Sequence, residues 1–387
     1  MTNAAILSVA CLLLLAYAVD RMGHKIGVPS VVALLVIGMA TKPIMGMMGV
    51  ELTGLDEFVP IIGTIGLVLI VLEGAFDLHL RRDRWGLSLM ALLMALAGVL
   101  GTAAVLTILG TTLMGITSIE AMLLALPISV ISSAVAIPAS AWMRPNQREF
   151  VVYETSISDI LGILLFYAIL NSDKTLGGTL TALSVNGGLS LLLGLGCALL
   201  LLFGLFELGG RIRFVPLLSG LFALYSVGKI LHLSPLIMVL IFGLVLNNMH
   251  LFRRFEWIQR IQRNPDSTRM ILEFKSITAE LTFAVRGIFF VLLGYWSDIG
   301  NMLDWRAMLT CALVLVVIYG LRYAMLSVAH VAYRESILWM APRGLISILL
   351  YYAAKPHVSV PAYLDGALML VVLASALGTS MASRNQK

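Results

Sequence analysis

The sequence predicts an all-α integral membrane protein, and three observations carry that prediction. Hydrophobic residues make up 60% of the 387 residues and only 12% are charged, which is about half of the charged share in soluble globular proteins. The apolar residues form runs that approach the roughly 20 residues needed to cross a bilayer as a helix. Because a lipid-exposed backbone must satisfy its own hydrogen bonds, runs of this length favour helices over a β-barrel.

Thirteen apolar segments are expected to form transmembrane helices, separated by charged residues or by Pro and Gly. In chain order they span residues 4–19, 28–41, 58–76, 86–110, 119–142, 150–170, 185–206, 214–231, 234–247, 279–297, 306–330, 336–354 and 361–381. The second and ninth segments are short for a hydrocarbon core of about 30 Å. We therefore expect these two to be tilted or to be surrounded by protein.

Basic residues predict the orientation of these helices. Most of the 26 Lys and Arg fall in the connections after the odd-numbered segments and at the C-terminus. The opposite connections hold five: Lys42, Lys174, Lys229, Arg306 and Lys355. Because cytoplasmic connections are enriched in Lys and Arg, the N-terminus is expected outside and the C-terminus in the cytoplasm. The net charge of +5 follows from this topology, and no pattern indicates nucleic-acid binding.

The segments suggest one transmembrane domain over residues 1–387, without a soluble regulatory domain. We expect two six-helix repeats of opposite orientation, over residues 1–170 and 214–381, with segment 185–206 as a linker helix. The longest connection, 250–280, contains basic residues around Trp257 and predicts either an amphipathic helix on the membrane surface or a simple linker. The three cysteines, Cys11, Cys197 and Cys311, lie far apart in apolar runs and read as small buried hydrophobes.

In residues 153–162, YETSISDILG, two carboxylates and three hydroxyls lie within the six residues 154–159, directly before a long apolar run. On a helix, Thr155 lies about 40° from Asp159 and shares its face, whereas Glu154 lies about 140° away. Intramembrane ionisable residues are candidates for function, and a hard cation prefers several oxygen ligands including an anionic one. Asp159 with Thr155, and with Ser158 at the edge of this face, therefore predicts part of a cation site. Glu154 is expected to neutralise an arginine on another helix.

Two further stretches predict interrupted helices. VISSAVAIP places Ser132, Ser133 and Pro138 in the middle of the fifth segment. WMAPRGLISI places Pro342, Arg343 and Gly344 in the middle of the twelfth. Proline removes a backbone donor, so unwinding is expected at both places. Interrupted helices at matching positions of inverted repeats indicate the central site of a transporter. The arginine would then offset the charge of the helix ends that meet there.

For the hydroxyl side chains and for Glu73, a structural role stays open beside a role in ion binding. Ser and Thr in membrane helices often bond back to their own turn or join helices, without a role in binding. Glu73, in IVLEGAF near the end of the third segment, fits an interfacial carboxylate as well as an ion ligand.

Taken together, the motifs resemble those of the monovalent cation:proton antiporters, in particular the NhaP-type sodium/proton antiporters, over essentially the whole chain. LIVLEGAFDLHL is similar to that family's helix-3 motif with Glu73 on the ion path. ETSISDILG is similar to its helix-6 motif, which implies that Asp159 binds cation and proton in turn with Thr155 as a hydroxyl ligand. The resemblance also implies crossed discontinuous helices 5 and 12, and a structural ion pair between Glu154 and Arg322 of GLRYAML.

Two positions depart from the family pattern. Ser158 stands before the aspartate where the family usually has Asn. The break in the fifth segment, with Ser132 and Ser133, has hydroxyls where the family usually has Thr-Asp, a feature shared with the potassium-efflux-like branch. Na⁺, Li⁺ and K⁺ therefore remain open as the transported cation.

The predicted function is exchange of one monovalent cation for one proton, electroneutral, by elevator-type alternating access. The alternatives are a cation channel or an ion or pH sensor without coupled exchange, and a proton-coupled carrier of a small organic solute. The sequence disfavours an enzyme and suggests no cofactor. The resemblance further implies a homodimer in a bacterial-type plasma (inner) membrane, with membrane lipid as its surroundings.

Overall fold

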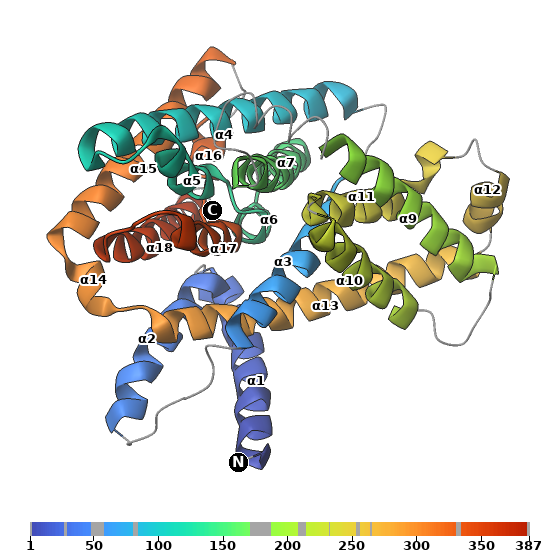
Figure 1. Cartoon of the computed structure of the whole chain (residues 1–387), viewed down its shortest axis with the longest axis horizontal. Helices are drawn as coiled ribbons and strands as arrows, with labels where there is room; N and C mark the ends of the chain where they lie inside the picture. Colours follow the sequence, from blue (N-terminus) through green and yellow to red (C-terminus); the bar gives the residue numbers. More distant parts are fainter. Residues whose placement is uncertain are drawn as a thin grey trace. The chain divides into compact units, whose positions relative to one another are not determined.

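The computed structural model describes residues 2–26, 29–47, 58–79, 84–170, 187–207, 214–231, 233–252, 256–263, 265–329 and 334–384. Within these ranges the regular secondary structure is entirely helical (Figure 1). Seven helical spans among the described residues are long and apolar enough to cross a membrane, and three shorter apolar helices accompany them. The predicted fold class, an all-helical membrane protein, agrees with this architecture. The count of thirteen membrane crossings and the inverted repeats stay predictions.

Each of the longer helices overlaps one of the expected apolar segments. They are α1 (Thr2–Ile26), α2 (Ser30–Met47), α3 (Phe58–Asp77), α4 (Trp85–Met114), α7 (Pro145–Leu170), α9 (Gly187–Glu207), α10 (Phe214–Ile230), α11 (Pro235–Asn247), α13 (Pro265–Trp296), α15 (Trp305–Val328) and α18 (Tyr363–Arg384). The fifth and twelfth segments are each divided, into α5 (Ser118–Ser129) with α6 (Ser133–Ala139) and α16 (Arg334–Leu338) with α17 (Leu345–Ala354). The described residues also form the short helices η3 (Met249–Phe252), α12 (Glu256–Arg263), α14 (Ile299–Leu303) and η4 (Lys355–His357).

The stretch 250–280 is the clearest difference from expectation. A helix does form around Trp257, as α12, but residues 265–280 belong to α13 rather than to a connection, because that helix already begins at Pro265. Proline is common in the first turn of a helix, because the N–H that it lacks would have no intrahelical acceptor there. Arg269 and Glu273, one turn apart on α13, form an ion pair with 2.8 Å between Nε and Oε1. The helix therefore extends well beyond the apolar stretch that predicted it.

The described helices belong to two compact units. The first comprises Met1–Gly66, Met90–Gly162 and Phe283–Lys387, and the second comprises Leu67–Leu89 and Ile163–Thr282. Each unit takes segments from both halves of the chain. The boundaries of the two units therefore differ from those of the two predicted repeats. The repeats themselves stay a prediction.

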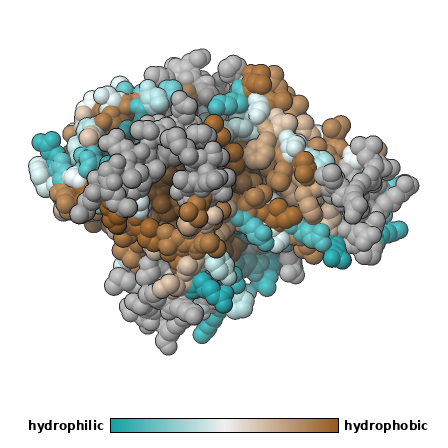
Figure 2. Space-filling view, turned by 90° about the horizontal axis from the view of Figure 1, so that it is seen from below, coloured by the Kyte–Doolittle hydropathy of each residue, from teal (hydrophilic) through white to brown (hydrophobic). Residues whose placement is uncertain are grey.

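In the first unit, α15 packs on α18 and α5 packs on α17. A cluster of buried apolar side chains joins α4, α5, α15 and α18 to the two helix breaks, with Ile131 from one break and Ala341 from the other. The outward sides of α4 and α15 carry exposed large apolar residues such as Ile108, Leu309 and Val316. Figure 2 shows hydrophobic side chains over much of the visible surface, as expected where lipid is the solvent.

In the second unit, α11 packs against α9 and α10. Gly194 of α9 lies directly against the backbone of Met238, so that a Cβ at this position would collide with it. The side-chain amides of Asn247 and Asn248, at the end of α11, donate to the carbonyl of Leu78 at 2.9 and 2.8 Å. These two bonds fix the end of α3 to α11.

Candidate functional site

Two helix breaks meet in the first unit. Residues 130–132 separate α5 from α6, and residues 339–344 separate α16 from α17 (Figure 1). The backbone N–H of Ser132 donates to the carbonyl of Pro342 at 2.8 Å. Gly344 lies so close to the hydroxyl of Ser132 that any Cβ at this position would overlap with it. The two predicted interruptions are therefore present, and they contact each other through backbone atoms.

Side chains from neighbouring helices hold the unwound residues. The hydroxyl of Ser158 accepts from the backbone N–H of Ile131 at 3.0 Å, and the hydroxyl of Ser375 accepts from the backbone N–H of Arg343 at 2.9 Å. Thr379 donates to the carbonyl of Trp339 at 2.8 Å. An unwound buried segment needs such partners because an unsatisfied backbone group is costly. Ser158 therefore has a bonding role in the break, beside its predicted place at the edge of the cation site.

Asp159 lies on α7, where its carboxylate faces the beginning of α6. Its Oδ2 accepts from the backbone N–H of Ser133, the first residue of α6, at 3.2 Å. The first N–H groups of a helix have no intrahelical partner and attract negative charge. Asp159 is 7% exposed, so it is buried but still reachable. The crossing thus holds an anionic oxygen ligand beside an unwound backbone.

Thr155 lies one turn before Asp159 on α7 and is fully buried. Its hydroxyl donates to the carbonyl of Val151 at 2.8 Å, so the proton points back into the helix and the oxygen lone pairs remain able to bind a cation. Ser156 is also buried, and its hydroxyl has no hydrogen-bond partner within the described part of the chain.

Glu154 turns away from this face and pairs with Arg322 of α15. Both carboxylate oxygens accept from the guanidinium at 2.8 Å, in a bidentate arrangement. Arg322 also donates from Nε to the carbonyl of Ile337, at 3.1 Å. Both residues are buried. Glu154 and Asp159 point to different sides of α7, and their carboxylates therefore lie in two different environments.

Arg343 lies in the second break and is 2% exposed. Its Nη1 donates to the carbonyl of Ala341 at 3.4 Å. Its guanidinium interacts electrostatically most strongly with Tyr319, then with Arg322, and more weakly with Glu154 and Asp159. The expected role of Arg343, to offset the charge of the helix ends that meet at the crossing, stays a prediction.

A family model described as the transmembrane sodium/hydrogen exchanger matches residues 9–383, nearly the whole chain. The chain belongs to the sodium/hydrogen exchanger family. It is therefore a multi-pass membrane protein of the monovalent cation:proton antiporters. No curated protein matches the chain significantly.

Solved structures agree with this assignment of the fold. The sodium/proton antiporter MjNhaP1 from Methanocaldococcus jannaschii, in a structure at pH 8, matches with a TM-score of 0.76 at 19% identity, over 99% of this exchanger and 98% of that chain. A map of the same antiporter from electron microscopy matches with a TM-score of 0.73 at 20% identity, over 100% and 98% of the two chains. At this identity the likeness establishes the fold alone.

Glu73, the remaining predicted residue of the exchanger, lies on α3 in the second unit and is partly buried. There it interacts electrostatically with Asp77 one turn later, and Asp77 in turn interacts with Lys275. Its place on the ion path stays a prediction.

Sequence reasoning missed Ser375 as part of the crossing. Ser375 follows the apolar run MLVVLA, where a lone serine is an ambiguous signal. Among the described residues no group of three or more His, Cys, Asp or Glu could hold a metal ion. The candidate ligands are instead one carboxylate, hydroxyls and unwound backbone, a set that suits a monovalent cation in transit.

Proposed function

We propose that this exchanger transports one monovalent cation against one proton, and that the two compete for the carboxylate of Asp159. The observation that carries the proposal is the position of Asp159: buried, partly reachable, and bonded to the first N–H of α6 at the contact of two broken helices. Buried carboxylates in membrane proteins mark ion and proton pathways. Broken helices provide the backbone groups that replace a cation's water shell.

Asp159 and Thr155 are the proposed primary ligands. The carboxylate supplies charge, and the hydroxyl of Thr155 presents its lone pairs because its proton is donated backwards to Val151. Ser132 and Ser133 lie at the start of α6, and the side chain of Ser132 makes no capping bond to that helix. We assign both serines to the edge of the site, with Ser158.

The buried charges favour electroneutral exchange. Glu154 and Arg322 neutralise each other in a bidentate pair, and Arg343 of the second break interacts electrostatically with Asp159. A proton on Asp159 and a monovalent cation beside ionised Asp159 give the site the same net charge. Exchange of one for the other therefore moves no net charge across the membrane.

For coupling, the site must open to only one side of the membrane at a time. We propose elevator-type alternating access, in which the broken helices and the site move together, with Glu73 on the path of the ion. The bonds that hold both breaks to α7 and α18 support movement as one body. We further propose a homodimer in a plasma (inner) membrane, with the N-terminus outside.

Transport by the purified exchanger in liposomes tests the proposal. A pH-sensitive dye inside vesicles acidified beforehand reports proton release when Na⁺, Li⁺ or K⁺ is added in turn. We expect saturable, cation-dependent release whose rate is the same with and without an imposed membrane potential. Asp159→Asn is expected to reduce release to the background of empty vesicles, since an amide cannot bind a proton and a cation in alternation.

Asp298→Asn is the matched control. Asp298 caps α14 by accepting from Gly300, and Asn caps helices as well as Asp does, so this variant should transport like the unmodified chain. Retained exchange in Asp159→Asn would remove Asp159 from the mechanism. A rate that follows the membrane potential would exclude the 1:1 stoichiometry, and cation flux without a proton gradient would indicate a channel.

A further inference from the structure

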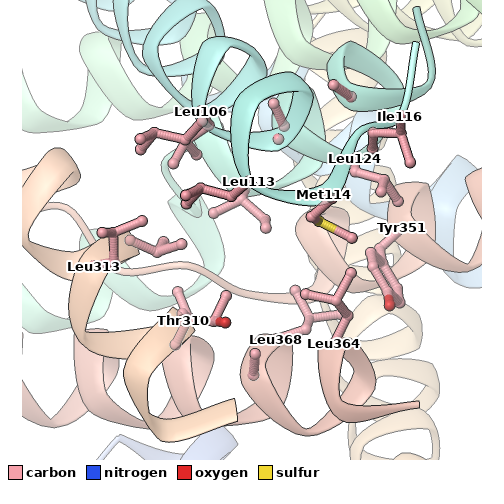
Figure 3. A pocket seen from close by; sticks show the side chains of 18 of the residues that line it. Leu106, Leu113, Met114, Ile116, Leu124, Thr310, Leu313, Tyr351, Leu364 and Leu368 are labelled. Carbon is pink, nitrogen blue, oxygen red and sulfur yellow. The ribbon is translucent and has the colours of Figure 1, made fainter. Parts of the chain in front are cut away.

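An apolar cavity of about 170 Å³ lies within the first unit, away from the helix breaks' polar residues. It is enclosed by α4, α5, α15, α17 and α18. Figure 3 shows Leu113 and Met114 reaching into it from one side, and Leu364 and Leu368 from the other, with Thr310 and Tyr351 at its flanks. None of the residues proposed for ion exchange lines this cavity.

The cavity opens at the surface of this unit. Leu113 and Leu313 line it and are 70% and 36% exposed, whereas the lining residues Leu368 and Val371 on the opposite wall are buried. Ile108 on α4 and Leu309 on α15, each next in sequence to a lining residue, are also exposed. In a membrane protein an apolar, exposed face of this kind contacts lipid, so the medium at the mouth is acyl chains.

The size of the cavity fits a segment of one acyl chain. An apolar cavity of about 150 Å³ in a soluble protein stays dry and binds benzene, so 170 Å³ accommodates a comparable number of carbons. Between a lipid tail and an apolar wall there is little hydrophobic gain. A void, however, loses the dispersion contacts of its walls, and a chain that enters restores them.

A basic side chain lies above the mouth on the same helix face. Arg306 is four residues before Thr310 on α15, and eight before Val314, so the three share one face. The guanidinium is exposed and stacks on Trp305, 5.7 Å from its ring centroid. Along the helix axis, the backbone of Arg306 is about 6 Å from that of the lining residue Thr310. Arg and Trp together at a helix end are typical of the headgroup region.

The acidic groups at this end of the helices already have donors. Asp304 accepts from the backbone N–H of Arg306 at 2.9 Å. Asp365 accepts from Lys355 at 2.7 Å and from the hydroxyl of Tyr351 at 2.9 Å. Glu120 accepts from the backbone and the hydroxyl of Thr117. The guanidinium of Arg306 makes no ion pair with any described residue and is therefore the charge that can receive a phosphate.

We propose that this cavity binds one anionic phospholipid, with part of an acyl chain in the cavity and the phosphate on Arg306. The cavity shares Leu106, Ala125 and Val371 with the apolar cluster that also contains Ile131 and Ala341 of the two breaks. The bound chain thus completes the packing behind the crossing. This lipid stabilises the unit that carries the site, and its binding is independent of which ion is exchanged.

Native mass spectrometry of the purified, delipidated chain tests this, with phosphatidylglycerol as the anionic probe and phosphatidylcholine of the same chains for comparison. We expect one tightly retained phosphatidylglycerol per chain, and a higher midpoint of thermal unfolding with phosphatidylglycerol than with phosphatidylcholine. Thr310→Phe fills the cavity and is expected to lose this lipid and the thermal shift. Met308→Phe, on an exposed position of the same helix that does not line the cavity, is expected to keep both.

Arg306→Gln leaves the cavity intact and should remove the preference for phosphatidylglycerol over phosphatidylcholine. Its control is Arg334→Gln, since Arg334 also stacks on an aromatic ring, that of Tyr323, but lies on α16, beyond the other end of α15. The proposal fails if Thr310→Phe retains the same lipid, if Met308→Phe loses it as well, or if Arg306→Gln and Arg334→Gln behave alike. Equal retention of both lipids by the unmodified chain would also overturn it.

Discussion

Glu154 and Asp159 are five residues apart on one helix, and their environments differ in kind. Both oxygens of Glu154 accept from Arg322, and the side chain is fully buried. Asp159 accepts from the backbone N–H at the start of α6 and keeps 7% of its surface exposed. A bidentate, inaccessible pair is suited to hold helices together, whereas a carboxylate that can be reached beside unwound backbone is suited to exchange its ligand.

The largest expected effect comes from breaking the structural pair. Glu154→Gln leaves Arg322 buried without its counter-charge, and removing one partner of such a pair destabilises a protein by about 3–5 kcal/mol. Asp159→Asn should cost far less, because the amide oxygen can still accept from Ser133. Thermal and chemical unfolding in detergent compare the two variants. Equal losses of stability would refute the contrast between them.

The second-largest effect is expected for the hydrogen bond between Ser158 and the break that separates α5 from α6. Ser158→Ala removes the acceptor of the Ile131 N–H, which leaves a buried donor unsatisfied, at about 1–3 kcal/mol. Ser158→Asn supplies a carbonyl oxygen instead and should retain most of the stability while changing the relative rates with Na⁺, Li⁺ and K⁺. Unfolding midpoints and proteoliposome rates measure the two outcomes. Unchanged cation preference in Ser158→Asn would place Ser158 outside the ion site.

A third effect sharpens the role of Thr155. Thr155→Val keeps the shape of the side chain but removes one oxygen ligand, and a lost bond to a charged group of about 1.5–3 kcal/mol corresponds to roughly 10- to 150-fold weaker cation binding. The apparent KM for the cation in proteoliposomes measures it. Thr278→Val is the control, because Thr278 is equally buried and bonds back to Phe274 at 2.8 Å on α13 of the second unit. Its KM should not change.

The smallest effect is the dependence on pH. Because proton and cation compete for Asp159, a lower pH on the side of cation entry should raise the apparent KM, while the maximal rate at saturating cation stays the same. Initial rates at several pH values and cation concentrations test this. A fall in the maximal rate with no change in KM would point to a proton site separate from Asp159.

Much of this architecture follows from local patterns. Apolar runs located the helices because burial in lipid demands them, and Pro342 with Gly344 located one break within the residues that are unwound. The other break precedes Pro138, which lies inside α6, because Ser158 and Pro342 provide bonds for the backbone of residues 131 and 132. Those bonds come from distant parts of the chain, so the local pattern placed the interruption only approximately.

The sequence by itself determined the class of protein, the helix that carries the candidate site, and the division of its two acids between different faces. These properties depend on helical periodicity and on the cost of charge in lipid, which act within one segment. The tertiary structure decided that Ser158 and Ser375 hold the breaks, that Gly344 leaves room for the side chain of Ser132, and that a cavity remains behind them. These features depend on how side chains from separate helices fill space together, and no single segment encodes that.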